Sequence, residues 1–281
     1  MSESDRPVSS APLDTADGGQ SESRRSNRWI FEVVEFDEWS NRQSENPALN
    51  VEEAYLVTRF FNKDSSTVDA GTGGGRVALA LRDAGYTDLH AFDFVPGNIS
   101  RARDRDPDGS IEFDVMDATD LQYADHTFGQ VIYPLAMISA IESEGQRQKA
   151  IREAWRVLKP GGVAIMTALP FEGARRSTVH AALIRYLTVL RTLRRSSRSL
   201  HDLPWLRLRQ KTNWSALADR GPYLHWYTIS EFQQDLLAGG FSIEALATKW
   251  QIERDHLCGS IDELITEPVV GMFYAVCLKS R

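Results

Sequence analysis

The fold is decided by one stretch of the chain, DAGTGGGR at residues 69–76, which joins an apolar strand to a helix through a turn of four glycines. Glycine permits a tight turn and lets a ligand approach the backbone closely. The start of the helix that follows presents free N–H groups and the positive end of a helix dipole, which favour a carboxylate or a phosphate. We therefore expect a ligand site where this strand ends.

Strands and helices alternate around this turn. Apolar runs predict strands at 66–70, 88–92, 111–115, 129–133 and 163–169, and helical spacing predicts helices at 76–84, 98–105 and 144–157. A lead-in helix is expected at 51–61, with Val51, Ala54, Tyr55 and Phe61 roughly at helical spacing. A later helix is expected at 230–238, with strands at 242–250 and 269–278. This alternation is typical of an α/β fold with a doubly wound, mostly parallel sheet.

Glycine-rich turns between a strand and a helix also occur in nicotinamide and flavin enzymes, so the details of the turn matter. The dinucleotide fingerprint needs a third small residue where this chain has Arg76. The pattern Asp-x-Gly-x-Gly-x-Gly at 69–75 instead resembles motif I of the class I S-adenosylmethionine-dependent methyltransferases. Three further motifs follow in that family's order and spacing: AFDF at 91–94, DVMDA at 114–118 and VLKPGG at 157–162. The resemblance covers about residues 68–169 and implies a Rossmann-like fold with a seven-stranded sheet.

The resemblance implies S-adenosylmethionine as the cofactor. In the family, the acid that matches Asp69 and the glycine turn hold the methionine part of the cofactor. The residue that matches Asp93 accepts hydrogen bonds from the two ribose hydroxyls, and the residue that matches Asp117 accepts one from the adenine amino group. Asp114 and Asp120 are rivals for this last role. The positions that match the family's cofactor site are Asp69, Ala70, Gly71, Gly73, Asp93, Phe94, Met116, Asp117, Ala118 and Tyr133.

One motif departs from the family pattern. Many relatives have Phe-Asp before the fourth strand, whereas this chain has Phe128-Gly129. The resemblance gives the missing acid a structural role or a place near the methionine end of the cofactor, so its loss puts the cofactor geometry in doubt more than the fold. Backbone at Tyr133 and Pro134 is still expected to line the pocket.

A segment at 171–227 interrupts the alternation and is basic. It holds eleven Lys or Arg and three Asp or Glu, a net charge of +8, in a chain whose formal net charge is −7. Residues at helical spacing along it are Val179, Leu183, Tyr186, Leu187, Leu190 and Leu193, with Arg185, Arg191, Arg194, Arg195 and Arg198 supplying the charge. We expect a helical lid over the carboxyl edge of the sheet. Three interpretations of its basic charge stay open: a helix face exposed to solvent, a binding site for an anionic acceptor, or contact with a membrane surface.

The end of this segment carries aromatic residues and a histidine. Trp205, Trp214, Tyr223, Trp226 and Tyr227 could stack on a planar or glycan acceptor, although aromatic side chains more often pack in a core. Since a base with a pKa near neutrality would help to deprotonate a hydroxyl acceptor, His225 is the best-placed catalytic candidate among the six histidines, and a purely structural role for it stays open.

Composition divides the chain into four parts. Residues 1–27 have almost no large apolar side chains and are expected to form a disordered tail, followed by a cofactor-binding core at 28–170, the insertion at 171–227 and a C-terminal part of the core at 228–281. Cys258 and Cys277 do not have the spacing of a disulfide framework or a zinc site, so we expect no metal. No apolar run is long enough to span a membrane and no secretory signal is evident, so a cytoplasmic location is expected.

These features together predict transfer of a methyl group to an oxygen or nitrogen atom of a small or medium metabolite, with O-methylation preferred. A nucleic-acid methyltransferase is favoured by the basic insertion but disfavoured by the acidic overall charge and by Tyr133-Pro134-Leu135-Ala136, which does not match the motif of amino-methylating DNA enzymes. Two more classes stay open: a nicotinamide-dependent oxidoreductase, which Arg76 disfavours, and a non-catalytic S-adenosylmethionine sensor, which Gly129 slightly supports. The sequence leaves the acceptor and the oligomeric state open.

Overall fold

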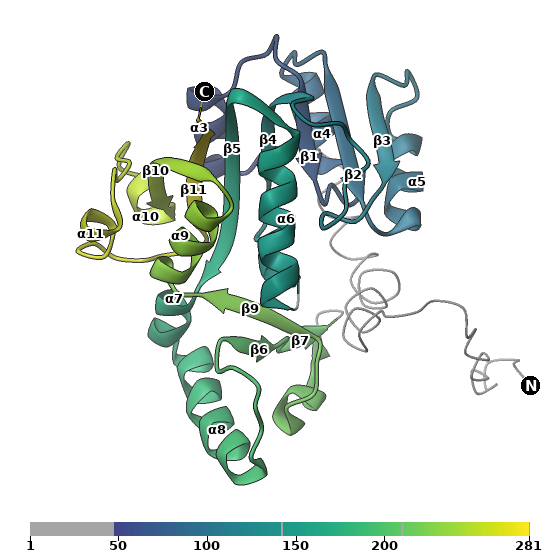
Figure 1. Cartoon of the computed structure of the whole chain (residues 1–281). Helices are drawn as coiled ribbons and strands as arrows, with labels where there is room; N and C mark the ends of the chain where they lie inside the picture. The colour runs from purple at the N-terminus through teal and green to yellow at the C-terminus, as the bar shows by residue number, and fades with distance from the viewer. Residues whose placement is uncertain (1–47, 142, 209–210, 281) are drawn as a thin grey trace, which may run out of the picture.

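A computed structural model describes residues 48–141, 143–208 and 211–280 of the chain. The expected disordered tail at 1–27 lies outside these residues. The described chain forms a central sheet covered by helices on both faces, with the insertion extending from the lower edge in Figure 1. No helix within the described ranges is long and apolar enough to cross a bilayer.

The central sheet follows the strand order β10-β11-β5-β4-β1-β2-β3. Its strands are β1 (Thr67–Ala70), β2 (Leu89–Asp93), β3 (Ile111–Val115), β4 (Phe128–Tyr133), β5 (Leu158–Pro170), β10 (Phe241–Thr248) and β11 (Phe273–Lys279). Along this path β11 alone runs antiparallel to its neighbours. The carboxyl ends of β1 to β5 therefore share one edge of the sheet, and this arrangement confirms the doubly wound, mostly parallel fold.

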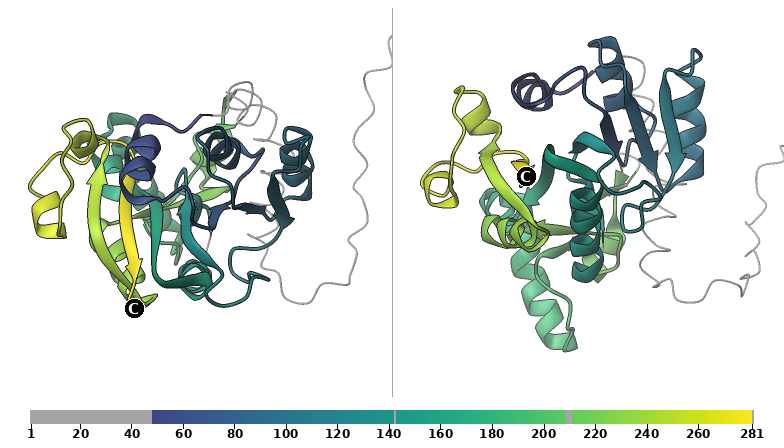
Figure 2. Two further views of the ribbon diagram at one scale, coloured as in Figure 1. Left: turned by 90° about the horizontal axis from the view of Figure 1, so that it is seen from above. Right: turned by 45° about the horizontal axis from the view of Figure 1, so that its top comes forward.

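Helices cover the sheet in two layers, as the view from above shows (Figure 2, left). One face carries α3 (Val51–Phe60), α4 (Arg76–Asp83), α5 (Pro96–Asp104) and α10 (Lys249–Ile252). The other face carries α6 (Glu144–Val157) and α9 (Ile229–Ala238), and the short α11 (Ile261–Leu264) packs near β10. Each layer has its own cluster of buried apolar side chains against the sheet, so the strands are apolar on both faces.

The number of strands and the face of the lead-in helix differ from expectation. Besides the seven strands of the main path, β9 pairs with the end of β5 and β6 pairs with β9, giving nine. The lead-in helix α3 buries Glu53, Leu56 and Val57, whereas Val51 is 74% exposed. Its buried face is set by an ion pair from Glu53 to Arg76, which apolar periodicity could not reveal.

Three strands have other bounds than expected for local reasons. β5 begins at Leu158, five residues early, because Leu158 pairs with Phe128 at the start of β4, before a register shift after which Val163 pairs with Gln130. β10 ends at Thr248, whose N–H and hydroxyl both donate to Gln251 Oε1 of the short α10, so Trp250 lies in that helix. The last strand begins at Phe273, after a turn at Gly271 with φ of +76°.

The insertion forms a helical arm and a small β unit at the carboxyl edge of the sheet. Its elements are α7 (Phe171–Arg176), α8 (Thr178–Arg194), β6 (Asp202–Pro204), β7 (Arg207–Leu208), β8 (Lys211–Thr212), η4 (Trp214–Ala218) and β9 (Tyr223–Tyr227). A small apolar cluster of Ala174, Leu183, Leu187 and Leu203 holds it together. Of the predicted apolar stripe on α8, Val179, Tyr186 and Leu193 are exposed.

Candidate functional site

The glycine turn between β1 and α4 requires backbone conformations that suit glycine. Gly71, Gly73 and Gly75 have φ of +67°, +57° and +87°. A Cβ on Gly71 would lie 2.7 Å from Cγ of Met137, and one on Gly75 would lie 3.2 Å from Cβ of Ala102. Gly75 therefore allows the close packing that the dinucleotide fingerprint assigns to the next position.

Asp69 lies at the end of β1 and is fully buried beneath this turn. Its Oδ2 accepts hydrogen bonds from Thr72 Oγ1 at 2.6 Å and from the backbone N–H of Ala78 at 3.1 Å. Its Oδ1 has no hydrogen-bond partner in the described part of the chain. Burial outweighs these hydrogen bonds and raises the pKa of Asp69 to about 6. The carboxylate therefore retains unused accepting capacity at the edge where a ligand is expected.

Asp93 ends β2 and is linked directly to the glycine turn. Its Oδ2 accepts the backbone N–H of Gly73 at 3.0 Å, and its Oδ1 accepts that of Val95 at 2.9 Å. Burial raises the pKa of Asp93, and these two N–H groups oppose the rise. The backbone N–H of Met116 donates to the Asp93 carbonyl at 3.1 Å, which ties the end of β3 to the end of β2.

Asp117 follows β3 and is half-buried at the same edge. One oxygen of Asp117 accepts both the N–H and the hydroxyl of Thr119, at 2.9 and 2.7 Å. Because the two oxygens of a carboxylate together accept about four hydrogen bonds, Asp117 can accept a ligand donor as well. Of the two rivals, Asp114 accepts a hydrogen bond from Tyr123 at 3.3 Å, and Asp120 is exposed. Asp117 stays the candidate that the resemblance implies, with Asp114 and Asp120 as its rivals.

The end of β4 forms a strained turn over the site. Leu135 and Ala136 have φ of +50° and +55°, a left-handed conformation that non-glycine residues rarely adopt. The hydroxyl of Thr167 on β5 holds this turn, because it donates to the Tyr133 carbonyl at 2.7 Å and accepts the Ala136 N–H at 2.6 Å. Tyr133 itself is fully buried. Strain of this kind is characteristic of functional sites.

The missing acid at Gly129 lies far from this edge. Gly129 is the second residue of β4, at the amino end of the strand, and its N–H donates to Ser66. A Cβ at this position would lie 1.9 Å from Oγ of Ser65. The departure from the family pattern is therefore compensated by local packing, and it does not disturb the carboxyl edge, contrary to the doubt raised by the sequence.

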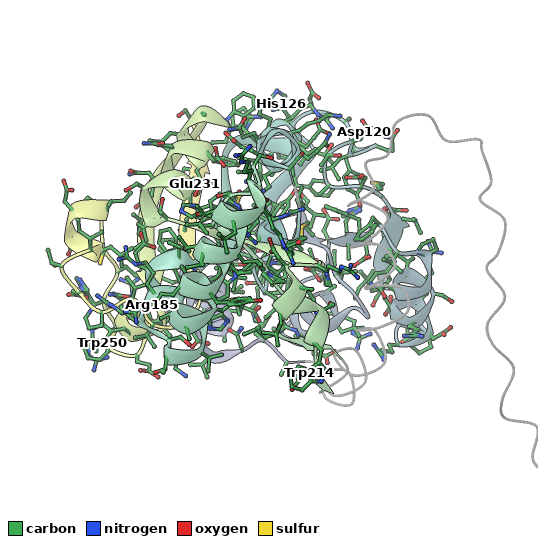
Figure 3. The ribbon with its side chains drawn as sticks, turned by 90° about the horizontal axis from the view of Figure 1, so that it is seen from below. Asp120, His126, Arg185, Trp214, Glu231 and Trp250 are labelled. Carbon is green, nitrogen blue, oxygen red and sulfur yellow. The ribbon has the colours of Figure 1, made fainter. Side chains whose placement is uncertain are left out.

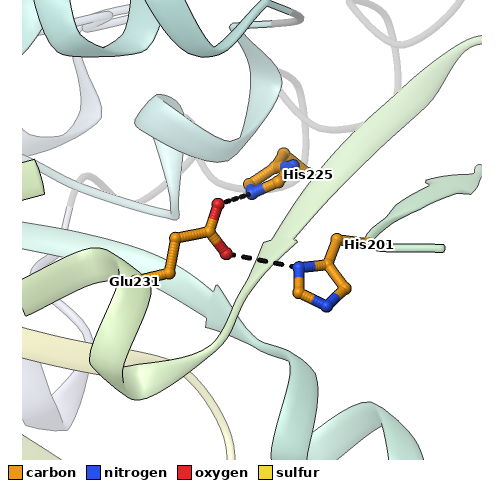
Figure 4. A group of neighbouring side chains, drawn as sticks. All are labelled: His201, His225 and Glu231. Atoms are coloured by element: carbon orange, nitrogen blue, oxygen red, sulfur yellow. Dashed lines mark hydrogen bonds and ion pairs between the residues drawn. The ribbon is translucent and has the colours of Figure 1, made fainter. Parts of the chain in front are cut away.

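His225 lies on β9 between the carboxylates of Asp202 and Glu231, and Figure 4 shows it with Glu231 and His201. Its Nδ1 is 2.8 Å from Asp202 Oδ1 and its Nε2 is 2.8 Å from Glu231 Oε1, while Glu231 Oε2 is 3.2 Å from Nδ1 of His201. Burial lowers the pKa of His225, but the two hydrogen bonds outweigh it and raise that pKa. Since both ring nitrogens are engaged, the geometry favours a structural or ligand-binding role for His225 over the general-base role expected from the sequence.

Much of the insertion's charge and aromatic surface has a structural role. Arg191, 3% exposed, makes two hydrogen bonds to Asp219, at 2.9 and 2.7 Å. Arg198 lies over the ring of Tyr223 at 3.7 Å. Tyr223 and Tyr227 are buried and cannot stack on an acceptor, whereas Trp214 is exposed. Figure 3 looks onto this edge, with Arg185 on α8 and Trp214 on η4.

A cleft of about 520 Å³ lies between the insertion and the core at the carboxyl edge. The core contributes the start of α6 and Glu231 of α9, and the insertion contributes the loop at 196–199 and His225. The charged groups that line the cleft are Glu144, Arg147, Arg198, Asp202, His225 and Glu231. The cleft is therefore strongly polar and carries both signs of charge.

The structure brings together the predicted residues of β1, β2 and β3 through direct hydrogen bonds and places those of β4 at the same edge. It places His225 apart from them, on β9 beyond β5. Sequence reasoning missed Thr167, Asp202, His201 and Glu231. For Glu231 a signal existed, because Thr228 and Glu231 form a capping box of the Thr-x-x-Glu pattern just after His225.

Comparison with known proteins identifies a methyltransferase domain in the chain. Residues 68–166 match the model of a family described as a methyltransferase domain. A demethylmenaquinone methyltransferase of Paenarthrobacter aurescens is 35% identical over 95 residues, which are 34% of this chain and 35% of that protein. A 27-O-demethylrifamycin SV methyltransferase of Amycolatopsis mediterranei is 31% identical over 99 residues, 34% of this chain and 35% of that protein. The chain thus spans about a third of the length of these curated relatives.

A solved structure shares the architecture over most of the chain. It is a SAM-dependent methyltransferase from Methanosarcina mazei with a TM-score of 0.60 and 19% identity, matched over 80% of this chain and 97% of that one. At this identity the likeness concerns the fold. Taken together, the comparisons show a methyltransferase domain at residues 68–166 within a Rossmann-like methyltransferase fold.

Proposed function

We propose that this chain transfers a methyl group from S-adenosylmethionine to an oxygen or nitrogen atom of a small or medium metabolite, releasing S-adenosylhomocysteine, with O-methylation preferred. The observation that carries the proposal is the hydrogen bond from the Gly73 N–H to the Asp93 carboxylate. It joins the glycine turn to the acid at the end of β2, the two features by which the family holds its cofactor. We assign cofactor binding to 28–170 with 228–281, and acceptor selection to 171–227.

The residues at this edge fit the cofactor. Asp69 Oδ1, buried and without a partner in the described structure, matches the ammonium or sulfonium charge of the methionine part. Asp93 suits the ribose hydroxyls and Asp117 the adenine amino group, with Ala70, Gly71, Phe94, Met116, Ala118 and the Tyr133 backbone around them. S-adenosylmethionine supplies an electron-deficient methyl carbon, so the protein needs chiefly to align an acceptor atom in line with it.

The cleft of about 520 Å³ is the proposed acceptor site, because it opens at the same sheet edge and is bounded by the insertion. Arg147 and Arg198 in its lining suit an acceptor with an anionic group. Methylation of oxygen is supported by the relative whose name states an O-demethylrifamycin substrate. Because His225 has both nitrogens engaged, alignment contributes more than base catalysis, and an acceptor of low pKa such as a phenol or a carboxylate is favoured.

The test is release of S-adenosylhomocysteine from S-adenosylmethionine with a panel of phenols, hydroxy acids, amines and short RNA. We expect turnover with an anionic or phenolic hydroxyl compound, abolished by Asp93→Ala and retained by Asp88→Ala, whose side chain is exposed. If only RNA is methylated, the acceptor is a nucleic acid and not a small metabolite. Tight cofactor binding without turnover on any acceptor would instead support an S-adenosylmethionine sensor.

A further inference from the structure

Two histidines and one glutamate converge where the insertion meets the core. His201 lies just before β6, His225 lies on β9, and Glu231 lies in the first turn of α9 (Figure 4). One nitrogen of each histidine and an oxygen of Glu231 lie within 4.8 Å of one another. From these contacts we propose that His201, His225 and Glu231 bind a divalent transition-metal ion of the Zn²⁺ class.

The donor set suits such an ion. Two imidazoles and one carboxylate are borderline donors that Zn²⁺ accepts, and this set of three leaves a fourth position open. Tetrahedral coordination at the usual bond lengths places donor atoms roughly 3.4 Å apart. At present Glu231 Oε1 is 2.8 Å from Nε2 of His225 and Glu231 Oε2 is 3.2 Å from Nδ1 of His201, and the donor atoms of the set lie within 4.8 Å of one another. Small side-chain movements would therefore complete the site.

His225 also has the outer partner typical of a metal-binding histidine. Its second nitrogen, Nδ1, is 2.8 Å from the carboxylate of Asp202. A carboxylate on the far nitrogen fixes the orientation of the ring and makes the ligating nitrogen more basic. Together Asp202 and Glu231 carry two negative charges, which a divalent ion neutralises in this half-buried place. Asp202 is thus a positioning residue for the metal rather than a ligand.

An entry path and an open coordination position are both provided by the cleft, since His225 and Glu231 line it. An ion bound here would hold two ligands from the insertion and one from α9, so it would clamp the insertion onto the core. Its open position would face the cleft, where a water molecule or an oxygen atom of an acceptor could bind. The ion is inferred from these side chains alone and does not depend on the proposed methyl transfer.

The test is titration of Co²⁺ and Zn²⁺ into chelator-treated full-length protein, followed by calorimetry and, for Co²⁺, by visible absorption. We expect one ion per chain, at least 100-fold weaker binding in His201→Ala and Glu231→Gln, and 10- to 100-fold weaker binding in Asp202→Asn. Zn²⁺ should raise the Tm of the wild type and leave that of His201→Ala unchanged.

A matched control is His256→Ala, because His256, Cys258 and Glu267 form a second group that could hold an ion. If the stoichiometric site is lost in His256→Ala and retained in His201→Ala, or if the wild type binds no ion, the proposal is overturned. Circular dichroism and S-adenosylhomocysteine binding establish that each variant is folded. Failure of the wild type to bind S-adenosylhomocysteine would instead count against the proposed function and leave the metal test intact.

Discussion

The carboxyl edge of the sheet at Asp69 and Asp93 and the insertion at 171–227 hold their charged groups by different means. At the carboxyl edge, backbone N–H groups fix the carboxylates: Gly73 and Val95 donate to Asp93, and Ala78 donates to Asp69. In the insertion, ion pairs between side chains fix the charged groups, as between Arg191 and Asp219. The first arrangement tolerates little substitution of glycines with positive φ, whereas the second depends on ion pairs that a single substitution can break.

The largest expected effect concerns the buried pair in the insertion. Arg191→Met leaves the Asp219 carboxylate buried without its partner, so we expect the local stability of the insertion to fall by about 3–5 kcal/mol. Hydrogen exchange of the α8 amides measures this, while affinity for S-adenosylhomocysteine should not change. The exposed Arg194→Met is the control, with an expected effect below about 0.5 kcal/mol. Equal losses of local stability in Arg191→Met and Arg194→Met would show that the ion pair between Arg191 and Asp219 does not stabilise the insertion.

The core also contains long-range ion pairs, among them the pair between Arg76 and Glu53. Arg76 binds Glu53 through two hydrogen bonds, at 2.7 and 2.8 Å, and both side chains are largely buried. Glu53→Gln removes the charge and should lower the free energy of unfolding by about 2–3 kcal/mol in urea titration. Glu52→Gln, whose partner Lys249 is 4.0 Å away, should cost much less. A similar loss of unfolding free energy in Glu53→Gln and Glu52→Gln would show that the ion pair between Arg76 and Glu53 adds no stability.

We expect the buried Asp69 to strengthen the binding of S-adenosylhomocysteine and to lower the free energy of unfolding. Its folded pKa, raised to about 6, lies above the unfolded value, so folding loses stability as pH rises from about 4 to 6. Asp69→Asn lacks this penalty and can keep both hydrogen bonds made by Oδ2. We expect it to be about 1–2 kcal/mol more stable than the wild type in urea at pH 8, with no gain at pH 4.

The same variant should bind S-adenosylhomocysteine more weakly. In the wild type that affinity should fall as pH drops through 6, because the protonated Asp69 no longer attracts the ammonium group. Asp88→Asn, with an exposed side chain, should show neither effect. A destabilised Asp69→Asn at pH 8 would refute the assigned role.

The smallest expected effect is a change in S-adenosylhomocysteine affinity that distinguishes Asp117 from Asp120. Asp117→Ala should weaken S-adenosylhomocysteine binding about tenfold, which corresponds to loss of roughly one hydrogen bond to a charged group. The exposed Asp120→Ala should leave the affinity within about twofold. Calorimetry with both variants measures the difference. If Asp120→Ala is the weaker binder, the assignment of the adenine contact moves to that residue.

The sequence allowed the parallel sheet, the glycine turn and the order of the carboxylates to be predicted, because each depends on residues adjacent in the chain. It could not reveal that Glu53 pairs with Arg76, that Thr167 holds the turn after β4, or that His225 lies between Asp202 and Glu231. Most of those contacts join elements far apart in sequence, although Glu231 is only six residues from His225. In the basic insertion the partner of Arg191 likewise lies 28 residues away.

The most direct test of the account is calorimetric titration of the wild type and Asp93→Ala with S-adenosylhomocysteine and, in parallel, with NADH. We predict that the wild type binds S-adenosylhomocysteine and not NADH. Asp93→Ala, which removes the carboxylate that receives the ribose hydroxyls, should bind about 100-fold more weakly with an unchanged fold by circular dichroism. No binding of S-adenosylhomocysteine by the wild type, or a preference for NADH, would contradict the central claim.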